Sequence, residues 1–167
     1  MEITRGLRLE TADQADVHRI ASWVTSEADV LTFAGPSLTY PFTAAEFFES
    51  TAGRRESFVL RAGSAAVATG ALEDRRPGEV RIGRVLVDPG QRGQGLGRAM
   101  MQLLIKRAAA RPGVRRLTLG VFEGNRPARV LYESLGFADT GGRVPIQVGQ
   151  QIWTSLEMKR ELVGNLP

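Results

Sequence analysis

The chain has 167 residues, of which 43% are hydrophobic and 24% charged, with no cysteine and a single histidine, His18. This length and mix suit one globular domain spanning residues 1–167. The lack of cysteine excludes a disulfide scaffold and a cysteine nucleophile, and one histidine leaves no histidine-rich metal site, so we expect no metal. The sequence shows neither a membrane-spanning apolar run nor a signal-peptide core, so we expect a cytoplasmic protein with no membrane partner.

Basic residues number 22 and acidic residues 18, which gives a net charge of +4 at pH 7. All of the basic residues except Lys106 and Lys159 are arginine. A compositional bias toward arginine is the simpler explanation of this excess. The alternative is that the guanidinium group suits phosphate and carboxylate partners. Because the arginines are scattered and not interleaved with aromatic residues, we expect no nucleic-acid partner. A small anionic ligand fits better.

The chain begins with a predicted strand and helix. Residues Leu7–Leu9 form the strand, and Thr11 is expected to cap the helix that follows. Apolar residues then recur at helical spacing: Val17, Ile20, Ala21 and Val24. Residues Phe33–Phe42 contain two prolines and a glycine, which predicts a loop.

A second helix and three strands are predicted next. Thr43 and Glu46 form a capping-box pattern at the start of this helix, and Gly53 is expected to end it. Three strand-like segments follow: Ser57–Arg61, Ala65–Leu72 and Val80–Val87. Residues Asp74–Gly78 predict the turn between the last two.

The remaining part of the chain alternates between helices and strands. A glycine-rich loop leads into a predicted helix from about Gly95 to Ala110. Leu117, Leu119 and Val121 alternate as a strand, and Pro127–Leu135 predicts another helix. A final strand pair starts at Phe137, with alternate residues on one face of the last strand: Ile152, Thr154, Leu156 and Met158. This order predicts a mixed sheet with helices on its faces.

The most informative segment runs from Val85 to Arg98 (VLVDPGQRGQGLGR), where a buried strand enters a loop with four glycines and then a helix. Glycines allow the backbone to approach a ligand closely, and the first amides of a helix have no internal partner. These amides and the helix dipole favour an anion, with Arg92 and Arg98 adding positive charge. A pyrophosphate is the expected ligand, and a tight turn that uses glycine only for its geometry is the alternative.

Two common nucleotide motifs fit this segment poorly. A P-loop requires a lysine that is missing here. A dinucleotide fingerprint places its third glycine one residue later than Gly97, and Glu123 then stands for the ribose-binding acid. The strands before the motif predict a meander and not the parallel crossovers that this fingerprint needs.

Two segments together resemble the GNAT superfamily of N-acetyltransferases. Arg92, Gly95 and Gly97, preceded by a valine-rich strand and Asp-Pro, match its first signature. Residues Asn125–Phe137 (NRPARVLYESLGF) match its second signature nearly residue for residue. The resemblance implies an α/β fold of the GNAT type, with a mixed, mostly antiparallel twisted sheet of about seven strands and about four helices on its faces.

The resemblance also implies acetyl-CoA as the co-substrate. The residues expected to bind it are Leu86, Val87, Arg92, Gly93, Gln94, Gly95, Leu96, Gly97, Arg98, Asn125 and Tyr132. The amides after Arg92 would hold the pyrophosphate, and free backbone groups of Leu86 and Val87 would pair with the pantetheine arm like an added strand. Asn125 would contact that arm, cap the next helix, or do both.

Catalytic roles follow from the same resemblance. Tyr132 matches the residue thought to protonate the departing CoA thiolate, and a tyrosine pKa of about 10 suits an acid; simple aromatic packing is the alternative. Glu73 or Glu79, which flank the predicted turn, would be the base, with solvated turn carboxylates and a water chain as the alternatives. Gly120 stands where some protein N-terminal acetylating relatives carry glutamate, which argues against a ribosomal-protein acetylator.

The expected function is therefore acetyl transfer to a primary amine of a small molecule or peptide by direct attack in a ternary complex. A strand-end amide, that of Val87, would polarise the thioester carbonyl. A non-catalytic CoA- or acyl-CoA-binding module is the alternative, and a nucleic-acid binder is a third hypothesis.

Substrate choice is expected to come from the loop Phe33–Phe42 and from Gly141-Gly142, predicted to connect to the last strand. Four aromatic residues would either line an acceptor pocket or pack against the sheet: Trp23, Phe33, Tyr40 and Phe42. By family analogy, a homodimer could form through the last strand, which follows Gln147, Gln150 and Gln151.

Overall fold

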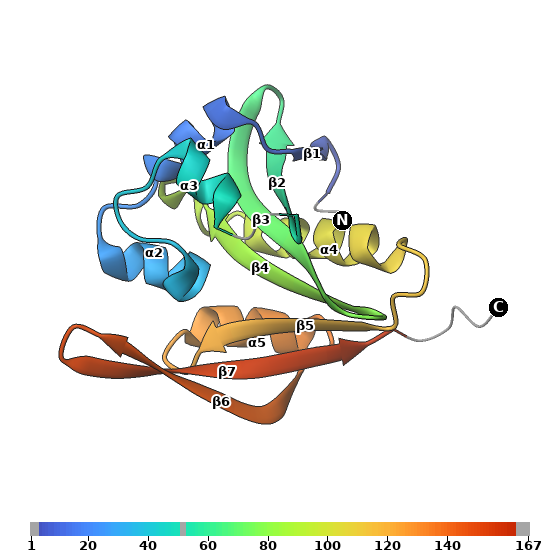
Figure 1. Cartoon of the computed structure of the whole chain (residues 1–167). Coiled ribbons are helices and arrows are strands. Elements are labelled where there is room, and N and C mark those ends of the chain that lie inside the picture. The colour runs from blue at the N-terminus through green and yellow to red at the C-terminus, as the bar shows by residue number, and fades with distance from the viewer. Residues whose placement is uncertain (1–3, 51–52, 163–167) are drawn as a thin grey trace.

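The computed structural model describes residues 4–50 and 53–162, which contain a sheet in the order β1-β2-β3-β4-β5-β7-β6 (Figure 1). The strands are β1 (Leu7–Thr11), β2 (Arg55–Ala62), β3 (Ala65–Arg76), β4 (Glu79–Val87), β5 (Arg116–Phe122), β6 (Ala138–Val148) and β7 (Gln151–Glu161). Neighbouring strands are antiparallel except β4 and β5, which are parallel. The prediction of a seven-stranded, mostly antiparallel mixed sheet is confirmed.

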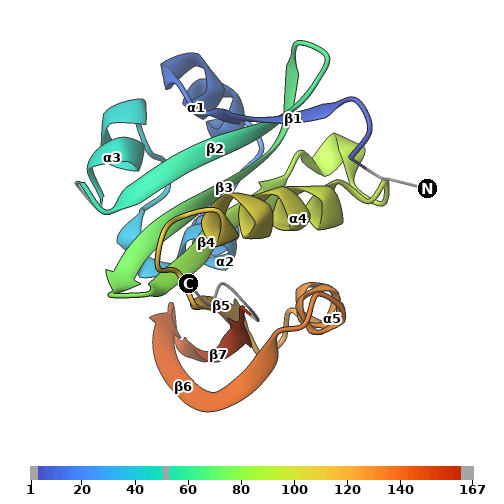
Figure 2. The ribbon, with the colours of Figure 1, turned by 90° about the vertical axis from the view of Figure 1, so that its right-hand side faces the viewer.

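Five α-helices occur among the described residues, one more than expected. They are α1 (Gln14–Ala21), α2 (Glu27–Ala34), α3 (Ala44–Glu49), α4 (Leu96–Ala109) and α5 (Arg126–Ser134). Figure 2 shows α4 and α5 on one side of the sheet and α1, α2 and α3 on the other. No helix in the described part of the chain has both the length and the apolar character that a membrane crossing requires.

The start of α1 differs from the prediction. Thr11 is the last residue of β1, where it pairs with Phe58 of β2, so it cannot cap the helix. Asp13 caps α1 instead, in a reciprocal capping box with Asp16. The helix ends at Ala21, and Val24 is a buried residue beyond it.

The loop predicted for residues 33–42 is wrong at its beginning, because Phe33 and Ala34 belong to α2. The Ser26 side chain accepts a hydrogen bond from the Asp29 amide, and apolar residues of this helix are buried. The signal for this helix in the sequence is thus a capping serine, Ser26, before an apolar run. A short 3-10 turn, Gly35–Ser37, follows α2.

The capping box of α3 is confirmed, because the Thr43 amide donates to Glu46 at 2.7 Å and the Thr43 hydroxyl accepts from the Glu46 amide. The helix ends at Glu49 with Ser50 as its C-cap, several residues before Gly53. The prediction that Gly53 ends this helix is therefore wrong.

The C-terminal strands correct two further expectations. The turn between β6 and β7 lies at Gly149 and Gln150, whereas Gly141 and Gly142 lie inside β6, where its pairing with β7 is irregular. The last strand, β7, is paired with β5 on one side and β6 on the other. It therefore offers no free edge to a second copy, and the edge strand at this end of the sheet is β6.

Close packing of α4 on β3 fixes the position of this helix. Met100 and Leu104 of α4 are fully buried against the sheet, in a core that includes Leu72 and Ile82. A Cβ atom at Gly70 of β3 would lie 2.7 Å from Leu104 Cδ1 and 2.9 Å from Met100 Cε. The missing side chain thus lets the helix lie close to the strand.

We predict that Gly70→Ala lowers the free energy of unfolding by about 1–3 kcal/mol, because an added methyl group overpacks this contact. Gly83→Ala in β4 is the matched control, since a Cβ there meets no atom within 4 Å. The control should leave stability unchanged or raise it by up to about 1 kcal/mol through the unfolded state. Chemical denaturation measures both variants, and equal effects would contradict the close packing.

Candidate functional site

The sheet opens between β4 and β5. Their parallel pairing is limited to three residue pairs, Glu79 with Arg116, Val80 with Leu117 and Arg81 with Thr118. Beyond Arg81 the strands diverge, and β5, β7 and β6 turn away from the rest of the sheet (Figures 1 and 2). The edge of β4 from Ile82 to Val87 therefore has no strand partner on this side.

A β-bulge in β4 lies at this opening. Thr69 pairs with Leu86 and Ala71 with Gly83, so Gly70 of β3 faces two residues of β4, Arg84 and Val85. Arg84 has a φ of 52°, which side chains other than glycine rarely adopt. A bulge bends its strand and redirects its side chains. Here it marks where β4 leaves β5.

Hydrogen bonds of its own side chain hold Arg84 in this conformation. The guanidinium donates to the Phe47 carbonyl at 2.8 Å, to Ser37 Oγ at 3.2 Å and to Ser50 Oγ. It also lies 5.0 Å from the centre of the Phe47 ring. The bulge is thus tied to α3 and to the turn after α2.

A cavity of about 740 Å³, the main cleft, occupies the opening. Its walls come from α2 on one side of the sheet and from the start of α4 and from α5 on the other. Residues that line it include Thr32, Phe33, Gly83, Leu86, Val87, Arg92, Gly97, Asn125 and Tyr132. The structure therefore brings together six of the residues expected to bind acetyl-CoA, from three separate segments.

The N-terminus of α4 meets the main cleft without a side-chain cap. Its N-cap is Gly95, with a φ of 78°, and the first backbone bond of the helix runs from Ala99 N to Gly95 O at 3.0 Å. The amides of residues 96–98 precede that bond, so they are free for a ligand, and the helix dipole makes this end attractive to an anion.

The other residues expected in this loop have different surroundings. Gly93 and Gln94 are exposed, and Leu96 points its side chain into the core, so only its amide is available to a ligand. Arg98 donates to Ser134 Oγ at 2.8 Å. A Cβ at Gly97 would lie 3.7 Å from Val87 and from Leu131, which is ordinary contact.

Tyr132 of α5 lines the main cleft. Its ring packs edge-on against that of Phe137, with 6.4 Å between the ring centres. Burial raises the pKa of the Tyr132 hydroxyl to about 12. The hydroxyl therefore stays protonated throughout the physiological range, as a proton donor requires. Asn125 accepts a hydrogen bond from the Ala128 amide at 3.4 Å, so it caps α5 and lines the cleft as well.

Neither Glu73 nor Glu79 is among the residues that line the main cleft. Glu73 is buried and accepts from Arg55 Nη2 at 2.7 Å, and its other oxygen lies 3.2 Å from Arg75 Nε. Glu79 stands at the far end of β4, where β4 and β5 are still paired, and lines a separate cavity. Of the two, Glu73 is the one in contact with residues near the opening.

A smaller cavity of about 330 Å³, the side cavity, shares Thr32, Phe33, Gly83 and Arg84 with the main cleft. Four arginines line it: Arg55, Arg75, Arg81 and Arg84. No motif in the sequence groups these four arginines. The one hint in the sequence is that Arg81 and Arg84 interrupt an otherwise apolar strand. Arg55 lies in a different strand, and no local pattern connects it with them.

The four aromatic residues proposed as substrate walls divide into two groups. Trp23, Phe33 and Phe42 are buried in the core beneath α1–α3, and Tyr40 is exposed. Trp23 and Phe33 also line the main cleft, so each of these two side chains both packs in the core and forms part of the cleft wall. Tyr40 and Phe42 line neither of the two cavities.

Comparison with known proteins gives one family. A model of the acetyltransferase (GNAT) family matches residues 17–137. Mycothiol acetyltransferase from Salinispora tropica is 42% identical over 77 residues, which are 44% of this chain and 25% of that protein. Spermine/spermidine N(1)-acetyltransferase from Bacillus subtilis is 36% identical over 69 residues, which are 41% of this chain and 45% of that protein. The chain thus spans less than half the length of either relative.

The solved structures show the same fold. Spermidine N-acetyltransferase from Vibrio cholerae, in complex with CoA and spermine, superposes with a TM-score of 0.78 at 14% identity. The match covers 94% of this chain and 96% of that one. At this identity the likeness concerns the fold alone.

We predict that Asn125→Ala lowers the free energy of unfolding by about 1 kcal/mol, because α5 loses its side-chain cap. Asn125→Asp keeps an acceptor oxygen and should keep most of that stability. Thermal or chemical denaturation compares the two variants with the original protein. If both lose the same stability, the capping role is wrong.

Proposed function

Because the chain belongs to the acetyltransferase (GNAT) family, we propose that it transfers the acetyl group of acetyl-CoA to a primary amine of a small molecule or peptide. The observation that supports this most directly is the opening between β4 and β5, which leads to the uncapped N-terminus of α4. We further propose that residues 1–167 act as one acetyltransferase domain. A homodimer and a cytoplasmic location stay predictions.

The residues around the main cleft suit CoA in three respects. The free amides at the start of α4, with Arg92 beside them, provide a site for the pyrophosphate. The unpaired edge of β4 at Leu86 and Val87 offers backbone groups to the amides of the pantetheine arm. Asn125 and Tyr132 face the same space from α5. Gly93, Gln94, Gly95, Leu96, Gly97 and Arg98 complete the proposed set.

Acetyl-CoA, when bound, supplies a thioester carbon that a neutral amine can attack. The chain has no cysteine to take the acetyl group first, so direct transfer in a ternary complex is the simplest path. The cleft would hold the amine nitrogen against that carbon. The C–N bond forms as the C–S bond breaks, with the Val87 amide donating to the carbonyl oxygen. Tyr132 then gives its proton to the departing thiolate.

The amine must also lose a proton, since an alkyl ammonium has a pKa of about 10.4. Glu73 and Glu79 remain the proposed bases. Because Glu73 is held by Arg55 and Arg75, and Glu79 lines a different cavity, the proton would reach either carboxylate through water. Of the two carboxylates, only Glu73 forms ion pairs with arginines that line the side cavity, and this cavity shares residues with the main cleft.

We predict that acetyl-CoA raises the melting temperature and that Gly95→Val abolishes this shift, because valine strains the αL cap and crowds the α4 amides. Gly113→Val is the matched control, since Gly113 has a φ of 76° in an open turn after α4. Differential scanning fluorimetry with and without acetyl-CoA gives the result. A normal ligand shift in Gly95→Val would contradict the proposed pyrophosphate site.

We predict that Tyr132→Phe lowers kcat by roughly 10²-fold or more while the KM for acetyl-CoA changes little, because only proton donation is lost. Tyr40→Phe, an exposed tyrosine outside both cavities, should be unaffected. Thiol release reports both rates.

The pH profile offers a second test of Tyr132. Its working form is the protonated one, which is lost as pH rises through the pKa of about 12. The kcat of the original protein should therefore show no fall due to Tyr132 between about pH 7 and pH 10. An unchanged kcat in Tyr132→Phe would reject the acid role of Tyr132. If acetyl-CoA binds but no amine gives thiol release, the non-catalytic CoA-binding module is the alternative that stands.

A further inference from the structure

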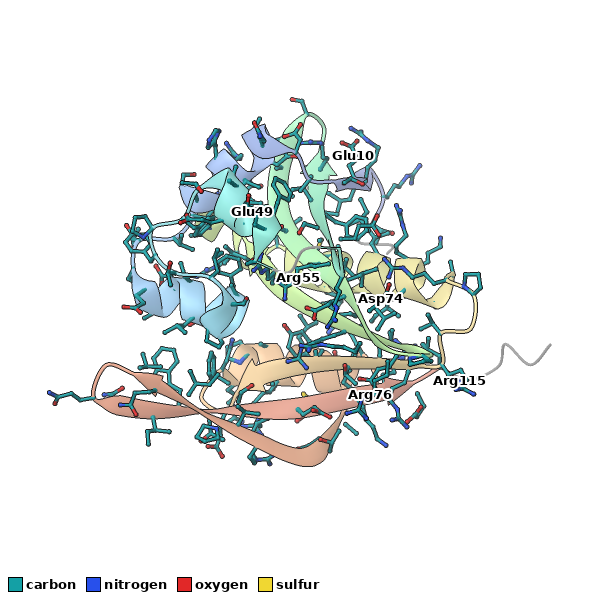
Figure 3. All side chains as sticks on the ribbon, in the orientation of Figure 1. Glu10, Glu49, Arg55, Asp74, Arg76 and Arg115 are labelled. Atoms are coloured by element: carbon teal, nitrogen blue, oxygen red, sulfur yellow. The ribbon has the colours of Figure 1, made fainter. Side chains whose placement is uncertain are left out.

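The side cavity is strongly basic. Arg55, Arg75, Arg81 and Arg84 line it, and no acidic residue does. They come from β2, β3 and β4, so the cluster is assembled by the sheet and not by one sequence segment. Figure 3 shows Arg55 beside β3, next to the opening in the sheet.

Two buried nitrogens of this cluster have no hydrogen-bond partner: Arg55 Nη1 and Arg84 Nε. Arg84 is only 3% exposed, and burial together with nearby Arg55 lowers its pKa to about 9, so it remains charged at neutral pH. Buried donors are nearly always paired in folded proteins. Both nitrogens belong to residues that line the side cavity, so two of its guanidinium groups have a donor that the chain leaves unpaired.

The carboxylates near the cluster do not balance its charge. Glu73 bridges Arg55 and Arg75. Among the described residues, Arg81 and Arg84 form no ion pair, and Glu157, which pairs with Gly120 across β5 and β7, is the exposed carboxylate near Arg81. The positive charge of the four arginines thus exceeds the negative charge of the carboxylates that pair with them.

Gly120 makes room for this arrangement. A Cβ atom there would lie 2.5 Å from Arg81 Nη2, so the guanidinium occupies the space that a side chain at position 120 would need. Burial lowers the pKa of Arg81, and the adjacent Arg75 lowers it further. The guanidinium of Arg81, a residue of β4, thus covers β5 at Gly120, where a larger residue would displace it.

We propose, on the basis of the acetyl transfer proposed above, that the acceptor is a small amine that also carries a carboxylate or phosphonate, and that this anion binds the arginine cluster. The side cavity joins the main cleft at Gly83 and Arg84, which would place the amine toward the thioester. Arginine suits such planar or tetrahedral oxyanions through paired hydrogen bonds. A cavity of about 330 Å³ suits a molecule of amino-acid size.

The same charge argues against a polyamine acceptor. A spermidine-like polycation would place further positive charge beside four guanidinium groups in a partly desolvated cavity. The relatives from Bacillus subtilis and Vibrio cholerae bear the names of spermine and spermidine. The arginine cluster therefore predicts a different acceptor class for this chain.

The test compares matched amines in a thiol-release assay with saturating acetyl-CoA. The probes are L-amino acids, their α-carboxamides, aminomethylphosphonate and spermidine. We expect kcat/KM for the best amino acid or for the phosphonate to exceed that of its uncharged counterpart, or of spermidine, by at least about tenfold. Aminomethylphosphonate separates a phosphonate preference from a carboxylate preference. Equal rates for acid and amide, or a preference for spermidine, would overturn the proposal.

Substitutions in the arginine cluster test whether the preference for an anionic amine arises there. Arg81→Gln removes a charge without breaking an ion pair, and Arg55→Gln removes the guanidinium whose Nη1 is unpaired. In both variants the ratio of kcat/KM for an amino acid to kcat/KM for its carboxamide (the acid-to-amide ratio) should fall toward one. The KM for acetyl-CoA should stay unchanged. Arg76→Gln is the control, because Arg76 is exposed at the end of β3, away from the side cavity (Figure 3). Melting temperatures check that each variant folds. A ratio unchanged in both cluster variants would exclude anion binding there.

Calorimetry separates this inference from the proposed function. Amino acids and amides are titrated into the CoA-saturated protein and into the free protein. If CoA binds but the acids bind no better than their amides, the inference fails and acetyl transfer stands. If CoA does not bind, the proposed function fails, and the titrations of the free protein still decide whether the cluster binds anions.

Discussion

The divergence of β4 and β5 is the constraint on which the rest of the molecule depends. Three pairs join the strands, and then the bulge at Arg84 bends β4 away. Had the pairing continued, the main cleft would be filled by sheet hydrogen bonds and β4 would have no free edge. The cost of a positive φ at a buried arginine is offset by the hydrogen bonds of its guanidinium to Phe47, Ser37 and Ser50.

Helix packing converts this opening into a site with two ends. On one side of the sheet, the close contact of α4 with Gly70 sets where the uncapped amides lie. On the other side, α2 closes the cleft with Thr32 and Phe33. The anion-attracting helix terminus and the arginine-lined side cavity thus lie at different ends of one continuous space, which joins at the bulge.

The role of Glu73 depends on where the fold places it. Beside a predicted turn it looks like a carboxylate free to accept a proton. In the fold it is buried and holds Arg55 and Arg75, so it positions the guanidinium groups that line the side cavity. Its proposed role as a base then requires a water between it and the amine.

The sequence by itself determined the position of most strands, the glycine loop before α4 and the helix that carries Tyr132, with Asn125 as its cap. These features depend on local spacing, on glycine conformation and on helix capping. The sequence did not predict α2. At the start of α1 several residues were suitable caps, and only the pairing of Thr11 with β2 shows that Asp13 is the cap. Tertiary structure alone decided the bulge, the opening and the arginine cluster. Arg55, Arg81 and Gly120 lie far apart along the chain, and only strand order and register bring their backbones and side chains together.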